Sequence, residues 1–126
     1  MDIVIRNDSG TPIYMQLYEQ ISAQIMRGEL EGDSSLPPIR TVAKELRVSV
    51  IPVKRAWEEL ERGGFIYTMA GKGCFVSPHK NAELDNKRDA IVTKKLRADV
   101  EYYKSLGIAL DELVEMISDC YNSENR

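Results

Sequence analysis

The chain has 126 residues, of which 43% are hydrophobic and 29% charged; this suits one small globular domain, or a small domain with an appendage, and a chain of this size rarely encloses two independent cores. The net charge is −3 at pH 7, which for a whole chain argues against a nucleic-acid partner. The charge is unevenly placed, however, because residues 40–80 carry eight Lys or Arg and only four Asp or Glu, and a local basic surface is what phosphate contact requires.

Residues 11–28 form the first predicted helix. Thr11 is expected to cap it, and Pro12 suits its first position, where a missing N–H costs nothing. Apolar side chains then recur every four residues, at Ile13, Leu17, Ile21 and Ile25. Gly28 is a stop signal, and the Gly, Ser and Pro residues within 29–38 predict a loop.

Two short helices are predicted next, near 39–46 and near 50–62. Ser49 in the tight connection between them is the expected N-cap of the second, and Pro52 is tolerated in that helix's first turn. Two short helices joined by a turn of a few residues make a helix-turn-helix. The side chains expected to face the core are Val42, Ala43 and Leu46 in the first helix and Val53, Ala56, Trp57 and Leu60 in the second.

A β-hairpin is predicted after the second short helix, which ends at Gly63-Gly64. Residues 65–68 and 74–77 are β-prone, and the glycines at 71 and 73 suit the turn between them. Helix, turn, helix and hairpin in this order form the winged variant of the motif. The sequence therefore predicts a mainly α fold with a small β-hairpin.

The C-terminal part, residues 79–126, follows a winged unit that we expect to span 1–78. Residues 82–106 and 108–122 place apolar side chains at helical spacing on either side of Gly107. Two amphipathic helices cannot enclose a core alone, so their apolar faces need the winged unit or a second copy of the chain. A second copy is the preferred interpretation, because it leaves the winged unit free. The residues expected at such a dimer interface are Leu84, Ile91, Leu96, Val100, Tyr103, Leu106, Leu110, Leu113, Val114, Ile117 and Tyr121.

A set of short motifs within residues 12–77 resembles the GntR family of bacterial transcription regulators in order and spacing. The matching segments are Pro12-Ile-Tyr14, Gly28 to Gly32, Leu36-Pro-Pro-Ile-Arg40, Val42-Ala43, Leu46-Arg-Val48-Ser49, Ala56-Trp-Glu-Glu-Leu60, Gly64-Phe-Ile66 and Gly71-Lys-Gly73-Cys-Phe75-Val76. Residues 80–126 are similar to the two-helix tail of the YtrA subfamily. The resemblance implies a winged helix-turn-helix with a dimerisation segment, in which a homodimer binds a palindromic DNA operator, often one that controls a transporter operon.

Three positions depart from the family pattern. Arg47 stands where the family usually has Gly, at a helix end that often requires a left-handed backbone, and a residue with a Cβ there costs about 1 kcal/mol. The recognition helix begins Ser49-Val-Ile-Pro52 instead of the family's Ser-Arg-x-Thr, and this removes the arginine for a guanine edge. Apolar contacts to thymine methyl groups are the expected replacement. Pro38 stands where Ser or Ala is usual.

DNA contact is expected from residues that match the family motif or follow it in the recognition helix. Arg40 matches the DNA-contacting arginine, and its guanidinium can bind a phosphate or a guanine edge bidentately; a salt bridge to a glutamate is the alternative. Ser49 can cap the helix and contact a phosphate. Val50 and Ile51 are expected to contact bases, with packing against the preceding short helix as the alternative. Lys54 is expected to face the groove and Arg55 a phosphate, with a solvated charge as the alternative for each. Gly71 and Lys72 are expected to contact DNA at the wing tip, with a tight hairpin and an exposed lysine as the alternative.

Other functions and ligands remain weaker interpretations. Val50 and Pro52 would also suit a winged helix that has become a protein-interaction module. A small enzyme would need a catalytic constellation that the sequence does not show. Cys74, Cys120 and the single histidine have no metal-site spacing, so no metal or cofactor is expected. No apolar run approaches the roughly 20 residues of a membrane span. The first residues do not resemble a secretory signal, and the two cysteines have no redox spacing, so a cytoplasmic protein with reduced thiols is expected. A small-molecule effector is not readable.

Overall fold

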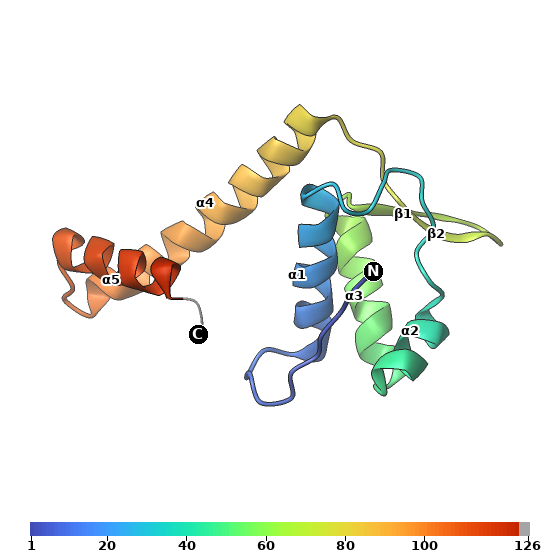
Figure 1. Ribbon diagram of the computed structural model, residues 1–126, viewed down its shortest axis with the longest axis horizontal. Helices are drawn as coiled ribbons and strands as arrows, with labels where there is room; N and C mark the ends of the chain where they lie inside the picture. The colour runs from blue at the N-terminus through green and yellow to red at the C-terminus, as the bar shows by residue number, and fades with distance from the viewer. Residues whose placement is uncertain (124–126) are drawn as a thin grey trace. The chain divides into compact units, whose positions relative to one another are not determined.

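A computed structural model describes residues 1–123, which fold into helices and one two-stranded antiparallel sheet (Figure 1). The elements are α1 (Ile13–Met26), α2 (Ile39–Leu46), α3 (Val50–Arg62), β1 (Ile66–Met69), β2 (Gly73–Val76), α4 (Asn81–Ser105) and α5 (Leu110–Asn122). This confirms the predicted mainly α fold with a small hairpin. The chain divides into two compact units, Met1–Asp85 and the residues from Asn86 onward.

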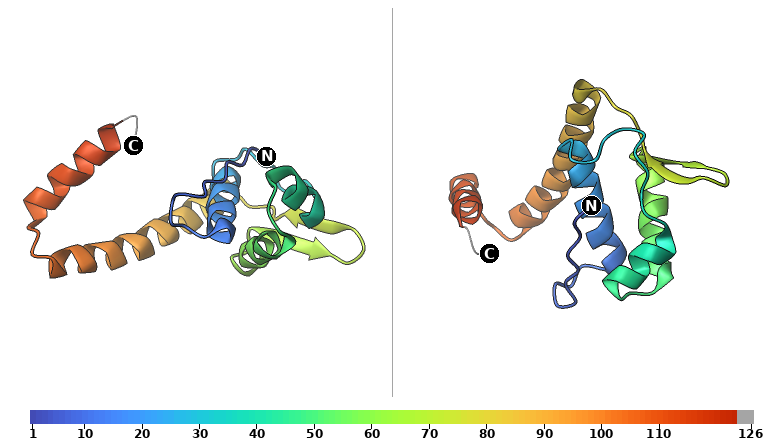
Figure 2. Two further views of the ribbon diagram at one scale, coloured as in Figure 1. Left: turned by 90° about the horizontal axis from the view of Figure 1, so that it is seen from below. Right: turned by 45° about the vertical axis from the view of Figure 1, so that its right-hand side comes forward.

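The first unit is a three-helix core with a projecting hairpin, the arrangement of a winged helix-turn-helix. α3 packs against both α1 and α2, and the hairpin extends away from these three helices in each view (Figures 1 and 2). Trp57 and its neighbours on α3 form the buried stripe that the sequence predicts. The buried apolar residues are Leu17, Ile21, Ile25, Leu36, Val42, Ala43, Val53, Ala56, Trp57, Leu60, Phe65, Ile66 and Val76.

The loop between α1 and α2 pairs with the hairpin. Ile66 is opposite Val76 and Met69 opposite Gly73 in the antiparallel register. On the other edge of β2, the Leu36 N–H donates to the Cys74 carbonyl at 2.9 Å, and the Val76 N–H donates to the Ser34 carbonyl at 2.9 Å. The loop thereby pairs with an edge of the hairpin that would otherwise be open.

Three glutamines hold the N-terminal segment along α1. The Gln20 amide exchanges two hydrogen bonds with the Val4 backbone, at 2.9 and 2.7 Å, and Gln16 does the same with Arg6, both at 2.8 Å. The Gln24 amide donates to the Asp2 carbonyl at 2.7 Å. Glutamines four residues apart on a helix are spaced by about 6 Å, and alternate residues of an extended chain by about 6.6 Å, so the two repeats match.

The starts of α1 and α3 differ from the predicted caps. Pro12, not Thr11, occupies the N-cap position of α1, because its carbonyl accepts from the N–H groups of Met15 and Gln16, both at 3.1 Å. Ser49 does occupy the N-cap position of α3, as predicted, but its side chain makes no capping hydrogen bond. The predicted side-chain cap at Ser49 is therefore wrong.

The end of α2 has the left-handed backbone that the family pattern suggests. Arg47 has φ +56° and ψ +44°, and its N–H donates to the Lys44 carbonyl at 3.2 Å. Most residues with a Cβ avoid this region because the side chain crowds the following carbonyl. Arg47 therefore carries the local strain that a glycine would avoid.

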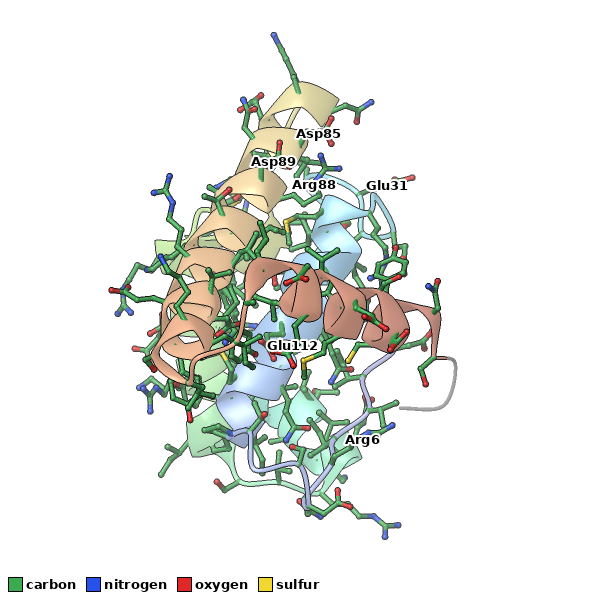
Figure 3. All side chains as sticks on the ribbon, turned by 90° about the vertical axis from the view of Figure 1, so that its left-hand side faces the viewer. Arg6, Glu31, Asp85, Arg88, Asp89 and Glu112 are labelled. Carbon is green, nitrogen blue, oxygen red and sulfur yellow. The ribbon has the colours of Figure 1, made fainter. Side chains whose placement is uncertain are left out.

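The second unit consists of the rest of α4 and α5, joined at the left-handed Gly107 (φ +84°). Its only buried side chain among the described residues is Leu113. Surface ion pairs such as Arg88–Asp89, at 3.0 Å, lie along α4 (Figure 3). In residues 1–123, no helix has the combination of length and apolar character needed to cross a membrane. The second unit alone thus lacks an enclosed core.

Candidate nucleic-acid interface

The first two turns of α3 present an apolar and basic surface. Ile51 is 78% exposed and Val50 is 38% exposed, whereas the buried stripe of the helix begins at Val53. Lys54 and Arg55 follow one turn later and are exposed. Because residues three and four apart share a helix face, these four side chains form one surface, which we call the α3 surface. An exposed isoleucine at a helix start contributes nothing to the core of the unit.

Arg40 and Ser49 lie at the starts of the two helices of the helix-turn-helix, Arg40 in α2 and Ser49 before α3. Arg40 is the second residue of α2 and is exposed, and in the described part of the chain it forms no ion pair. Ser49 directly precedes α3, and its exposed hydroxyl makes no hydrogen bond within residues 1–123. Both polar groups can therefore accept an external partner without breaking an internal interaction.

Arg55 contacts a side chain of α1. Its Cζ atom lies 3.7 Å from the ring centroid of Tyr14, in a cation–π contact. The sequence-based interpretation of Tyr14 as a packing residue is correct, since its ring is half-buried and packs beside the core. The contact between the two residues is not predictable from the sequence, because it depends on how α1 and α3 pack.

The wing tip has the predicted turn. The Lys72 N–H donates to the Met69 carbonyl at 2.9 Å, and Gly71 and Gly73 have φ of +76° and +105°. The space around both glycines is open, and the lysine is exposed. A backbone without side chains and with one cation at its end can approach the phosphates that border a groove.

Two tyrosines near the hairpin have pKa values above the ordinary range. The hydroxyl of Tyr67 donates to Asp33 at 2.8 Å, and this hydrogen bond raises the Tyr67 pKa because the phenolate form cannot donate it. Burial raises the pKa of Tyr18, with a further contribution from the Glu59 charge. Tyr67 also stacks on Phe75, with ring centroids 5.6 Å apart. The hydrogen bond from Tyr67 to Asp33 joins the hairpin to the loop between α1 and α2.

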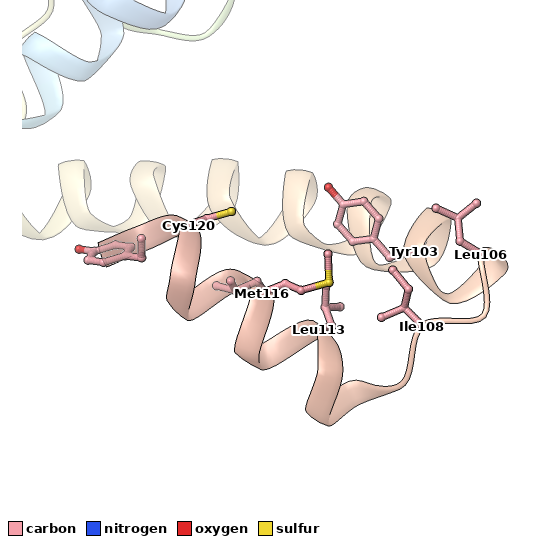
Figure 4. A pocket seen from close by; sticks show the side chains of 8 residues that line it. Tyr103, Leu106, Ile108, Leu113, Met116 and Cys120 are labelled. Carbon is pink, nitrogen blue, oxygen red and sulfur yellow. The ribbon is translucent and has the colours of Figure 1, made fainter. Parts of the chain in front are cut away.

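Several of the predicted dimer residues line an open apolar groove in the second unit (Figure 4). The groove has a volume of about 560 Å³ and lies between the end of α4 and α5. Leu84 is different, because it packs against the core of the first unit. The groove is lined by Tyr103, Leu106, Ile108, Leu113, Met116, Ile117, Cys120 and Tyr121.

The two cysteines and the histidine lie in different segments of the chain. Cys74 is half-buried in β2, with its Sγ 3.5 Å from the Thr68 hydroxyl, and Cys120 is exposed on α5. The His79 Nδ1 atom is 3.0 Å from the Ser77 carbonyl. Within residues 1–123, no three His, Cys, Asp or Glu side chains gather as metal ligands.

Comparison with known sequences places the chain among bacterial regulators. Residues 13–76 match the family described as "Bacterial regulatory proteins, gntR family". The chain is 32% identical over 109 residues to the HTH-type transcriptional regulator YhcF of Bacillus subtilis, covering 86% of the chain and 89% of the relative. It is 28% identical to the HTH-type transcriptional repressor YtrA of the same organism, covering 88% and 85%.

Solved structures agree with these sequence matches. A GntR family transcriptional regulator from Listeria monocytogenes superposes with a TM-score of 0.70 at 25% identity, covering 89% of this chain and 97% of that one. The DNA-binding domain of AraR, solved in complex with operator ORX1, superposes with a TM-score of 0.54 at 25% identity, covering 61% and 96%. YhcF, YtrA and the Listeria protein are all named as transcription regulators or repressors. The chain belongs to the GntR family of bacterial transcription regulators.

Proposed function

We propose that the chain is a transcription repressor that binds a palindromic operator as a homodimer. The single observation that supports this most strongly is the α3 surface, on the second helix of a helix-turn-helix. There Ile51 is 78% exposed beside two cations that form no ion pair within residues 1–123. In a winged helix-turn-helix this helix enters the major groove. Repression would follow from occupancy, since a bound dimer blocks the same DNA to other proteins.

Direct base contact in this proposal comes from apolar side chains. Val50 and Ile51 replace the arginine and the following residue of the usual family motif, and neither carries a donor or acceptor on its side chain. The thymine C5-methyl group is the apolar feature of the major groove, so we assign these residues to thymine methyls. Arg40, Ser49 and Lys54 would then fix the position of the helix through phosphates or base edges, and Gly71 and Lys72 would contact the flanking backbone.

The second copy would be held by α4 and α5. Leu110, Val114 and Tyr121 are 77%, 55% and 89% exposed on α5. Burying such a surface stabilises association by about 25 cal/mol per Å² before the costs of ordering are subtracted. The full interface that we propose is Ile91, Leu96, Val100, Tyr103, Leu106, Leu110, Leu113, Val114, Ile117 and Tyr121; Leu84 is omitted because it packs in the first unit.

The relatives support the same proposal. YtrA, which the chain matches over most of both lengths, is named as a transcriptional repressor. The AraR DNA-binding domain, which has the fold of the first unit, has been solved with its operator. A protein-interaction module is the competing function, because an exposed isoleucine also suits a protein partner.

The experiment is enrichment of a random duplex pool by the full chain, followed by fluorescence anisotropy titration of the enriched duplex against a scrambled one. We expect tight binding to the enriched duplex only, which weakens steeply as salt rises. Arg40→Ala is expected to weaken binding by about 1–3 kcal/mol. Equally weak binding to both duplexes, or none at low salt, would contradict the proposal and favour a protein partner.

The apolar readout has its own test in the same duplex. Replacing a contacted thymine by uracil removes one methyl group and keeps the base pair. For the wild type, we expect uracil at one or two positions per half-site to weaken binding by about 1 kcal/mol. For Ile51→Ala, the same uracil substitution should weaken binding by less, because the shortened side chain no longer reaches the methyl group. Uracil at positions outside the half-sites is the control.

A further inference from the structure

Arg55 is held in place without using any of its hydrogen-bond donors. Its guanidinium lies 3.7 Å above the ring of Tyr14 and forms no hydrogen bond or ion pair in the described part of the chain. Stacking of this kind uses the face of the guanidinium and leaves the five N–H groups at its edge available.

Ordinary ion-pair partners are within helical reach of Arg55 and are not used. Glu58 and Glu59 follow it by three and four residues, the spacing at which helical ion pairs form. Glu59 is paired with Arg62 instead, and Glu58 forms no ion pair within residues 1–123. The ring of Tyr14 has therefore taken the place of a carboxylate, and the positive charge of Arg55 is not neutralised locally.

Arg55 is itself part of the α3 surface, whose other side chains we propose contact DNA. It follows Lys54 by one residue and Ile51 by four, so a ligand that meets those two side chains passes beside it. The edge of a guanidinium matches two oxygens of one phosphate. A free arginine loses rotamer freedom when it binds such a group, and one already stacked on a ring loses less.

We propose that Tyr14 is a positioning residue that holds Arg55 ready to bind a backbone phosphate beside the recognition helix. This inference rests on the proposed DNA-binding function and adds a residue of α1 to it. The ring carries the role, and the tyrosine hydroxyl is not required.

The test is a double-mutant cycle on the enriched duplex, with Tyr14→Leu, Arg55→Gln, their combination, and Tyr14→Phe as the matched control. Affinity is measured at several salt concentrations. We expect Arg55→Gln to reduce the slope of log affinity against log salt by about 0.9 for each phosphate that the arginine neutralises in the wild type. Tyr14→Leu is expected to weaken binding about three- to tenfold, Tyr14→Phe to bind like the wild type, and the double variant to bind no more weakly than Arg55→Gln alone.

Each outcome separates this inference from the proposed function. If the wild-type chain binds no duplex selectively, the proposed function and the inference both fail. If it binds but Tyr14→Leu leaves affinity unchanged, or the two reductions in affinity multiply, only the inference is overturned. Circular dichroism shows whether each variant folds. If a variant does not fold, the test is the proton NMR spectrum of the wild type, in which the Arg55 Hδ protons are expected at chemical shifts upfield of those of the other arginines. An ordinary chemical shift would overturn the stacked arrangement.

Discussion

Arg47 is the residue where local strain is most directly visible. Its left-handed backbone ends α2 and begins the turn that sets the angle between α2 and α3. The sequence predicts this conformation from the family pattern, in which a glycine is usual, and the structure confirms it. A side chain at such a position is maintained by the packing of the two helices on either side.

Replacing Arg47 by glycine is therefore expected to stabilise the first unit. Relief of the left-handed strain raises the free energy of unfolding by about 1 kcal/mol, reduced somewhat by the larger backbone entropy of glycine in the unfolded chain. The change is measured by unfolding in urea. Arg47→Ala keeps the strain and removes the charge, so it serves as the control; equal stabilisation in both variants would contradict the backbone explanation.

The contact between Arg55 and Tyr14 shows what sequence alone leaves out at this scale. The sequence places Arg55 on an exposed helix face and Tyr14 beside the core, and both placements agree with the structure. Their stacking depends on the packing of two helices whose contacting residues lie about forty positions apart, and no local pattern encodes it.

At the scale of elements, helix positions are predicted well because apolar periodicity is a local signal. The predicted ranges 39–46 and 50–62 coincide with α2 and α3. The ends of helices are predicted less accurately, because neighbouring residues can compete for the capping hydrogen bonds. In α1, for example, Pro12 and not Thr11 occupies the N-cap position. Residues 1–9 lack helical periodicity and are held by glutamines on α1, 10 to 22 residues away, so their place is not predictable locally.

The glutamine contacts give a prediction for the N-terminal segment. Gln20→Ala removes two hydrogen bonds to the Val4 backbone and is expected to lower the free energy of unfolding by about 1–2 kcal/mol. In hydrogen exchange the Val4 amide should lose protection, whereas the Arg6 amide, which Gln16 holds, should keep it. Glu19→Ala, a change on the same helix that leaves the glutamines in place, is the control, and equal loss of protection in both variants would rule out the pairing.

The hairpin gives a prediction about pH. The pKa of Tyr67 is raised by its hydrogen bond to Asp33, so folding favours the protonated hydroxyl. The resulting stabilisation is complete below the unfolded tyrosine pKa of about 10 and is lost as pH rises through the higher folded value. Tyr67→Phe should therefore lose less stability than the wild type between neutral pH and pH values above about 10. Parallel stability curves for the two proteins would contradict this cause.

At the scale of the molecule, the second unit leaves an apolar surface exposed, which we propose a second copy of the chain covers. α5 carries four carboxylates, at 111, 112, 115 and 119, among its apolar residues, and only Leu113 of this helix is buried. The sequence predicts both helices. Their amphipathic pattern indicates that each has an apolar face to bury, but it does not decide whether the winged unit or a second copy of the chain covers that face.

Ile117→Glu tests the proposed dimer. It places a charge in the apolar groove and is expected to reduce the mass measured by light scattering at micromolar concentration from twice the chain mass to a single 14.3 kDa chain. Glu115→Gln, at an exposed position of the same helix outside the groove lining, should leave the dimer intact. An unchanged mass for Ile117→Glu would mean that the dimer interface lies elsewhere. A monomeric wild type would contradict the proposed dimer.

The measurement that tests the whole account most directly is hydroxyl-radical footprinting of the full chain on its enriched duplex. A dimer with one recognition helix in each of two successive major grooves predicts two protected patches, related by two-fold symmetry and about 34 Å apart on one side of the duplex. Protection of a single asymmetric patch, or uniform weak protection along the duplex, would contradict a symmetric dimer that recognises DNA through α3.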